Sequence, residues 1–310
     1  MSPKKTIFSR KASEKIKVTI VTPVFNQADT LTETIESVLA QSYKNIEYII
    51  VNDGSTDNTQ TIIEKYENKI KIMNQKNLGQ SSALNNAWRV ASGEYLTYLS
   101  ADDILYKDGI KNLISHIDGT ADIYYPDYDL IDRASNKIEE IRTKNYCRKD
   151  LVCKLICQPG LATIFKSEVF WRIGGWNDQL SFVPDLEFWL KASQFANFKR
   201  VPIVCGGFRI HGKSGSIRKV KRHQSDEILH LTHLKSKTNG DKCLKLQRIN
   251  ALAISSRSHL QSNRLFLGLV RYLMIFGLEP RQALKPAILR FILAGVARVF
   301  YYKLRSYVKC

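Results

Sequence analysis

The sequence predicts an α/β protein with a mainly parallel β-sheet flanked by helices and a basic, helical C-terminal extension. Apolar, strand-like runs alternate with amphipathic segments through the first hundred residues, which is typical of parallel strands joined by crossover helices. Polar residues collect where these runs end. Lysine and arginine are concentrated in the last hundred residues, where the pattern is helical.

The first hundred residues supply the expected sheet. Helices are predicted over 29–42, through Tyr66 and over 81–91, because apolar residues recur there at helical spacing. The segments with the apolar composition of buried strands are 17–25, 46–53, 70–75 and 94–100.

From about residue 122 the pattern becomes strand-rich and irregular, with helices expected over 167–175 and 184–194. Residues 211–310 hold 20 Lys or Arg against 4 Asp or Glu, whereas residues 18–210 carry a net charge of −3. This split predicts two physical tasks. We expect a basic N-terminal segment, an α/β domain and a basic amphipathic helical region, with the boundaries 1–16, 17–215 and 216–310.

The six cysteines show no CxxC pair and no spacing typical of a zinc site, so we expect reduced, mostly buried thiols. The first 17 residues lack the apolar core of a signal peptide, which favours an intracellular protein.

Polar side chains follow the predicted parallel strands at the edge where such sheets bind ligands. Asn26, Asp53 and Asn77 each follow a strand, and Asp102 and Asp103 follow the strand over 94–100. Mg2+ typically takes one or two carboxylates together with phosphate oxygens and water. When the two adjacent aspartates are taken alone, a solvated turn or a helix cap is the better explanation, because Asp is common at both.

Two neighbouring loops favour the ligand-binding interpretation. Gly54 lets the loop after Asp53 approach a ligand closely, and Asn77 and Gly79 precede a helix whose first amides favour anions. Each loop alone is also compatible with an ordinary turn.

Three segments, taken in order, resemble glycosyltransferase family 2, the inverting enzymes with the GT-A fold. They are VTIVTPVFNQADTLTETIESVLAQSY, EYIIVNDGSTDNT and NLGQSSALNNAWRVASGEYLTYLSADD. The resemblance is dense over about 18–110 and looser through about 215. It implies that Pro23 and Phe25 line the nucleotide base pocket, beside Asn26, and that Asp53 hydrogen-bonds the base.

The resemblance also implies a metal site for Mg2+ or Mn2+ at Asp102 and Asp103. The family's acidic motif is often Asp-x-Asp, and its first position here is Ser100. This departure removes one carboxylate that usually faces the sugar, so the donor is less defined. Asn77 and Gly79 fall in the matching donor-side loop.

The segment GGWNDQLSFVPDLEFWLKA resembles the family's acceptor segment, in which a carboxylate at a helix start acts as general base. Asp185 occupies that position, with Glu187 as a supporting residue; alternatively Asp185 only stabilises its helix. Trp176 either stacks on a sugar or packs in the core. His211, in FRIHGKSGS, either contacts phosphate or is structural.

Between residues 265 and 307, apolar runs are interrupted by Lys and Arg about every seven residues, too often for a membrane span. This pattern favours a helix on a membrane surface. Packing against the catalytic domain, a dimer contact and nucleic-acid binding are the alternatives, the last without a recognised module.

The sequence therefore predicts a metal-dependent, inverting hexosyltransferase that takes sugar from a nucleotide-sugar donor, with a UDP-sugar expected. The expected acceptor is a growing cell-surface glycan or a lipid-linked molecule, reached by peripheral contact at the cytoplasmic face of the membrane. Nucleic acid is not an expected partner, and an oligomer stays open. The alternative is a catalytically weakened nucleotide-sugar-binding or scaffold protein of a membrane-associated glycan assembly complex.

Overall fold

The computed structural model describes residues 16–210, 221–233 and 241–293. The chain packs into two compact units, each built from discontinuous segments. The boundaries expected at 16/17 and 215/216 remain sequence predictions. The first unit contains Met1–Tyr146, Gln158–Asp178 and Lys191–Arg209, and the second contains Cys147–Cys157, Gln179–Leu190 and Ile210–Cys310.

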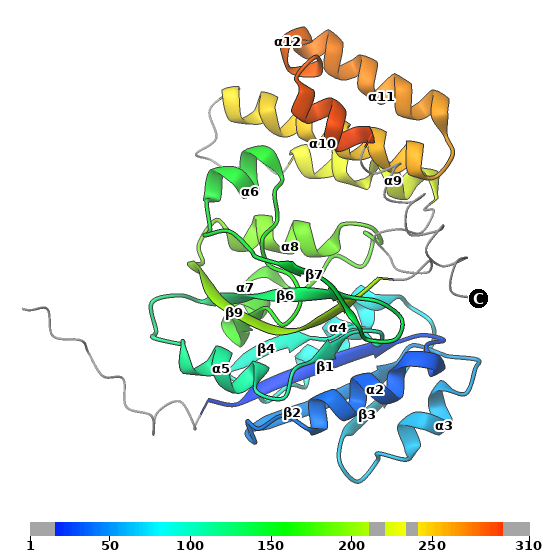
Figure 1. The fold of residues 1–310 in the computed structure, drawn as a ribbon, viewed down its shortest axis with the longest axis vertical. Helices are drawn as coiled ribbons and strands as arrows, with labels where there is room; N and C mark the ends of the chain where they lie inside the picture. Colours follow the sequence, from blue (N-terminus) through cyan, green and yellow to red (C-terminus); the bar gives the residue numbers. More distant parts are fainter. Residues whose placement is uncertain (1–15, 211–220, 234–240, 294–310) are drawn as a thin grey trace, which may run out of the picture. The chain divides into compact units, whose positions relative to one another are not determined.

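The first unit contains a nine-stranded sheet among the described residues (Figure 1). Its N-terminal half is parallel, in the spatial order β3-β2-β1-β4. All four strands lie close to the segments predicted from sequence, and β1, β2 and β4 are buried apolar runs, whereas β3 is partly exposed. They are β1 (Val18–Val24), β2 (Ile46–Asn52), β3 (Lys71–Asn74) and β4 (Tyr95–Tyr98).

The other half of the sheet is mixed. β8 (Ile164–Lys166) is antiparallel to β4 and to β6 (Ile123–Ile131), which continues the sheet parallel to β9 (Phe198–Arg209). β5 (Ile104–Leu105) and β7 (Lys137–Ile141) are short antiparallel additions to β9 and β6. Most paired residues lie in parallel ladders, so the predicted α/β class is confirmed.

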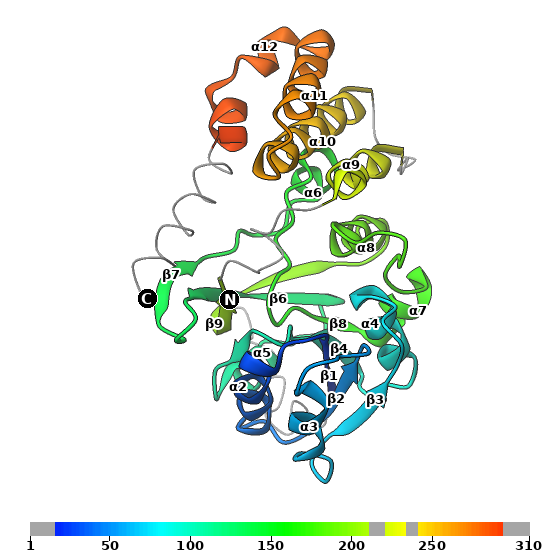
Figure 2. The ribbon, with the colours of Figure 1, turned by 90° about the vertical axis from the view of Figure 1, so that its right-hand side faces the viewer.

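Helices cover both faces of the parallel strands, with α2 (Ala28–Leu39) on one side and α4 (Gln80–Arg89) on the other (Figure 2). Leu31 and Ile35 of α2 are fully buried in the main core cluster. On α4, Trp88 meets Phe165 edge-on, with ring centroids 5.4 Å apart. The remaining helices of this unit are α3 (Thr59–Glu64), α5 (Gly109–Ser115) and α7 (Ser167–Ile173).

The second unit is helical, as expected for the region after 216. Its own apolar cluster includes Ile249, Leu252 and Ile275. None of the helices within the described residues is long and apolar enough to span a membrane. The helices are α6 (Arg148–Lys154), α8 (Pro184–Ala192), whose last two residues pack with the first unit, α9 (Arg222–His230), the 3-10 turn η1 (Leu231–His233), α10 (Asp241–Gln261), α11 (Leu265–Leu278) and α12 (Pro280–Ala283).

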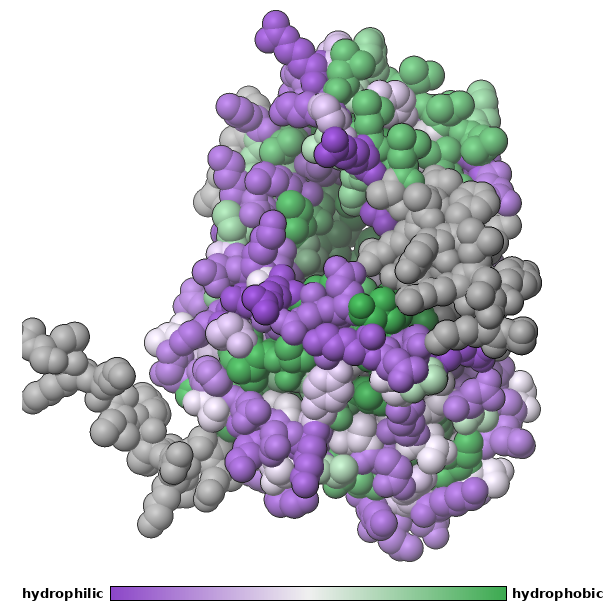
Figure 3. Space-filling model, in the orientation of Figure 1, coloured by the Kyte–Doolittle hydropathy of each residue, from purple (hydrophilic) through white to green (hydrophobic). Residues whose placement is uncertain are grey.

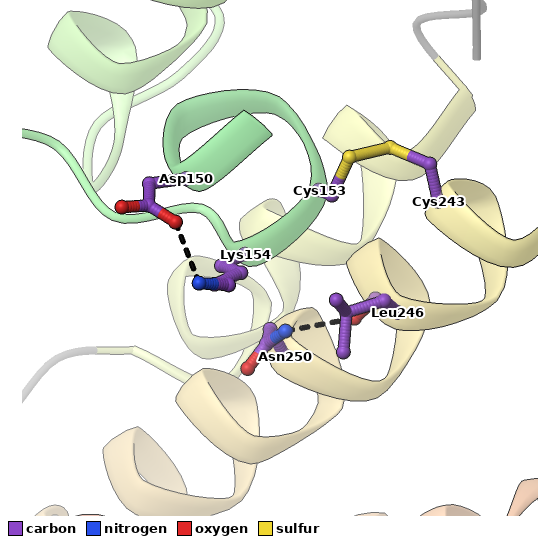
Figure 4. Close-up of a disulfide and its surroundings, with 6 residues drawn as sticks. All are labelled: Asp150, Cys153, Lys154, Cys243, Leu246 and Asn250. Atoms are coloured by element: carbon purple, nitrogen blue, oxygen red, sulfur yellow. Dashed lines mark hydrogen bonds and ion pairs between the residues drawn. A yellow bond between two sulfur atoms is a disulfide. The ribbon is translucent and has the colours of Figure 1, made fainter. Parts of the chain in front are cut away.

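The prediction of reduced thiols was wrong for one pair of cysteines. Cys153 on α6 and Cys243 on α10 form a disulfide within the second unit (Figure 4). The two residues are separated by 90 positions, so no local spacing pattern could reveal the pair. Cys147, Cys157 and Cys205 remain thiols, and burial raises the pKa of Cys205 to about 12. Cys310 lies outside the described residues.

Candidate active site

The carboxyl ends of β1, β2, β3 and β4 lie at one edge of the sheet, because the four strands are parallel. Pro23 is buried within β1, whereas Phe25, just beyond it, is 42% exposed. Asn26 joins this end to the loop after β2: its backbone N–H donates to Ser55 Oγ (3.0 Å), and its Oδ1 accepts from the Thr56 N–H (2.7 Å). The structure therefore brings the predicted strand-end segments together.

Asp53, which follows β2, hydrogen-bonds the loop that follows β3. Its carboxylate is almost fully buried and accepts hydrogen bonds from Gln75 Nε2 (2.7 Å), the Leu78 N–H (2.8 Å) and the Gly79 N–H (2.9 Å). A carboxylate has about four acceptor sites, so these three bonds leave about one of them for a ligand.

Backbone geometry fixes the same pair of loops. Gly54 has φ +73°, and a Cβ there would lie 2.9 Å from the backbone nitrogen of Asn77, so only glycine fits. Asn77 is exposed, and Gly79 (φ 90°) precedes the first turn of α4. The predicted donor-side residues thus border one rigid loop pair.

The two adjacent aspartates differ in environment. Asp103 is 3% exposed, and its Oδ1 accepts from the Arg209 N–H at 2.8 Å, with a further hydrogen bond from the Ser100 side chain. Burial, followed by the neighbouring Asp102 charge, raises the pKa of Asp103 well above its usual range. Asp102 is half-buried. Asp103 therefore faces the interior more than Asp102 does.

Side chains from other elements hold the loop that carries this pair. The carbonyl oxygens of three consecutive residues accept bonds: Ala101 from Thr30 Oγ1 (2.8 Å), Asp102 from Arg209 Nε (2.6 Å) and Asp103 from Thr34 Oγ1 (2.8 Å). Each bond removes freedom from the acidic loop, which pre-organises it.

Arg209 is the residue that sequence reasoning missed. It is 1% exposed, and its guanidinium also donates to the carbonyls of Asp132 and Arg133 (3.0 Å each) and pairs with Glu33 Oε2 (2.7 Å). The available signal was a charged residue inside the apolar run that ends β9, because buried arginines are rare unless paired.

The Trp176 side chain is buried against other aromatic rings. It is 4% exposed and meets the rings of Trp88 and Tyr98 edge-on at 5.9 and 5.2 Å. Asn85 clamps its backbone, donating to the Trp176 carbonyl (2.7 Å) and accepting from its N–H (2.8 Å). Stacking of Trp176 on a sugar stays a prediction.

Asp185 and Glu187 lie in the first turn of α8, in the second unit. Asp185 is half-buried, and burial raises its pKa above the ordinary value of 3.8. Glu187 is 4% exposed. His211 lies outside the described residues, so its predicted phosphate contact stays a prediction.

The carboxylate pair fits a hard divalent cation that shares its coordination with a phosphate ligand. Within the described residues, no group of three His, Cys, Asp or Glu side chains could enclose a metal ion. Mg2+ bound beside a diphosphate needs only one or two protein carboxylates, and Mn2+ accepts the same oxygen ligands. A cation would also offset the negative charge gathered at Asp102 and Asp103.

A sequence profile described as glycosyl transferase family 2 matches residues 19–174, half of the chain. The chain belongs to glycosyl transferase family 2. The match extends from β1 to Gly174, so it includes Asp53, Asp102 and Asp103 and stops before Trp176 and Asp185. The resemblance stated from sequence is therefore confirmed at the level of the family.

Known relatives are similar in sequence to part of this family 2 chain. An uncharacterized glycosyltransferase of Rickettsia typhi is 36% identical over 183 residues, which is 56% of this chain and 58% of the relative. The chain thus spans less than two thirds of that relative's length.

Solved structures share the fold. Staphylococcus aureus TarS 1–349, in complex with UDP-GlcNAc, aligns with a TM-score of 0.63 at 16% identity, over 94% of this chain and 92% of that one. The mannosyltransferase PcManGT of Pyrobaculum calidifontis, in complex with GDP-Man and Mn2+, aligns with a TM-score of 0.59 at 14% identity, over 92% and 87%. At these identities the likeness concerns the fold alone, which is of the GT-A type.

Proposed function

We propose that this protein is a metal-dependent, inverting hexosyltransferase that moves sugar from a UDP-sugar to a hydroxyl group of a growing cell-surface glycan or lipid-linked acceptor. The observation that carries the proposal is the acidic loop at Asp102 and Asp103, held by Thr30, Thr34 and Arg209 beside the carboxyl ends of parallel strands in a family 2 chain.

The donor would lie over these strand ends. Phe25 offers an exposed ring for the base next to Pro23 and Asn26, and Asp53 holds the loop of Asn77 and Gly79 in place while it contacts the base. TarS is described in complex with UDP-GlcNAc and PcManGT with GDP-Man, which supports a nucleotide-sugar donor. We propose UDP as the nucleotide of this donor.

Asp102 would bind Mg2+ or Mn2+ with the help of Asp103. When bound, the ion neutralises charge on the departing diphosphate. The Mn2+ of the PcManGT complex supports this choice of metal. Asp103 also keeps the loop in register through its bond to the Arg209 N–H.

Asp185 would take the proton of the acceptor hydroxyl as that oxygen attacks the anomeric carbon, while the nucleoside diphosphate leaves from the opposite face. The raised pKa of Asp185 makes its carboxylate a better proton acceptor. We assign supporting contacts to Glu187, sugar contact to Trp176 and phosphate contact to His211.

The second candidate is a catalytically weakened nucleotide-sugar-binding or scaffold protein. Ser100 favours it, because the family often has a third carboxylate there and Ser100 instead hydrogen-bonds Asp103. In both cases we propose peripheral contact of the C-terminal region with the cytoplasmic face of a membrane, with no nucleic-acid partner and with the oligomeric state open.

The test is turnover of a panel of nucleotide sugars with and without Mn2+, measured as released nucleoside diphosphate. We expect at least one UDP-sugar to be turned over, and Asp185→Asn to lower this rate at least about a hundredfold while UDP still binds. Glu168→Gln is the matched control, because Glu168 is an exposed carboxylate in the first turn of α7. UDP binding without turnover of any donor would favour the scaffold function.

A further inference from the structure

Helix α11 presents an apolar face that none of the described residues covers. Five side chains form it, and they are between 42% and 77% exposed. Figure 3 shows hydrophobic surface gathered over the part of the molecule where Figure 1 places α11. At 100° per residue the five side chains fall within an arc of about 100°. We call this the α11 face: Leu265, Phe266, Leu269, Leu273 and Phe276.

The opposite side of α11 is anchored, so the helix cannot roll to bury this face. The Gly268 carbonyl accepts from Ser256 Oγ at 2.8 Å, and a Cβ on Gly268 would lie 2.7 Å from Leu260 of α10. Arg271 Nη2 pairs with Asp226 of α9 at 2.8 Å, and Ile275 is fully buried. Exposure of the apolar face is therefore built into the packing.

The exposed charged side chains in the described segment after α11 are positive. Arg281, Lys285 and Arg290 are exposed in the segment that follows α11. Three of the four carboxylates between 211 and 310 already have partners. Asp226 pairs with Arg271, Glu279 with Lys245, and Glu227 accepts from the backbone of Ser181 and Phe182.

We propose that the α11 face docks on the surface of an anionic lipid bilayer. Its leucines and phenylalanines enter the boundary between headgroups and acyl chains, and the cations at 281, 285 and 290 meet the anionic headgroups. This names the surface for the membrane contact in the proposed function and does not require sugar transfer. A contact between two copies would bring like charges together, and nucleic acid would leave the apolar face in water.

The experiment is sedimentation of the full chain with vesicles of phosphatidylcholine alone and of phosphatidylcholine mixed with phosphatidylglycerol, at low and high salt. Leu269→Gln/Leu273→Gln tests the apolar face, and Arg281→Gln/Lys285→Gln/Arg290→Gln tests the cations. Val90→Gln/Trp171→Gln is the matched control, because these side chains are similarly exposed in the first unit.

We expect wild type and control to bind the mixed vesicles, and the double Leu variant to bind at least about tenfold more weakly. The cation variant should lose the preference for the anionic lipid and its salt sensitivity. UDP-sugar turnover without vesicles should be equal in all four proteins, which separates this test from that of the enzyme. Unchanged vesicle binding in the Leu variant, or a solution dimer that this variant dissociates without any vesicle binding, would overturn the proposal.

Discussion

The Arg209 side chain links the acidic loop to α2 and to the turn after β6, and we expect it to set the metal affinity of that loop. Arg209→Lys keeps a charge but cannot reproduce the bonds from Nε to Asp102 and from Nη1 to Asp132 and Arg133. We predict a folded protein whose Mn2+ affinity, measured by electron paramagnetic resonance, falls at least about tenfold.

Glu33→Gln is the control for this variant. Glu33 pairs with Arg209 but its side chain is 47% exposed, so the charge it contributes is screened by solvent. Mn2+ affinity should change little there. An Arg209→Lys protein with wild-type Mn2+ affinity would show that the loop holds its shape without this side chain.

Asp185 gives the proposed reaction a characteristic pH dependence. A general base acts only when ionised, and burial raises the pKa of Asp185 above 3.8, so the rate should fall as pH drops through that raised value. We predict an acidic limb in kcat/KM, displaced upward from the ordinary aspartate range, that Asp185→Glu retains. In the residual activity of Asp185→Asn this limb should be absent; its persistence there would assign the limb to another group.

At the scale of single residues, sequence predicted the strand-end positions better than their contacts. Asp53 and Asp103 were located through strand pattern and family resemblance, but that both carboxylates are buried and bonded to backbone N–H groups depends on chain folding beyond the local motif. Arg209 was missed because its partners come from segments more than 70 positions away.

Among the elements, α6 and α10 carry a stabilising feature that sequence pattern did not reveal. Their disulfide joins residues 90 positions apart. In the chain-entropy account, a cross-link over a loop of this length lowers the entropy of the unfolded chain and stabilises the folded state by about 4–5 kcal/mol. We predict that dithiothreitol lowers the free energy of unfolding of the second unit by up to that amount. Limited proteolysis at increasing urea concentrations measures this free energy.

Cys153→Ser/Cys243→Ser should match the reduced wild type and should not respond to dithiothreitol. Cys147→Ser, which removes an exposed thiol, should behave as wild type in both conditions. If wild type resists dithiothreitol and the double variant is equally stable, the bridge contributes nothing to the second unit.

The regular elements followed from sequence where their pattern was local. β1, β2 and β4 are continuous buried runs, and α7, which ends at a left-handed Gly174, lies within the helix predicted over 167–175. The two-residue strand β5 has too few residues for a periodic signal, and its pairing with Gly206 and Gly207 depends on the long, irregular β9.

For the whole molecule, charge composition and packing divide the chain differently. Sequence separates a weakly acidic body from a basic tail near residue 215, whereas the second packed unit also takes in 147–157 and 179–190. Such discontinuous segments leave no visible shift in composition, because each of them is short. The candidate base Asp185 therefore belongs to a different packed unit from the acidic loop.

The measurement that tests the central claim most directly is calorimetric titration of UDP into the full chain with and without Mn2+, for wild type, Asp102→Asn and the control Glu168→Gln. If the acidic loop binds the metal, Mn2+ should tighten UDP binding at least about tenfold in wild type and in the control. Asp102→Asn should lose only this Mn2+-dependent gain in affinity. Equal affinity with and without Mn2+ in wild type, or an unchanged gain in Asp102→Asn, would contradict it.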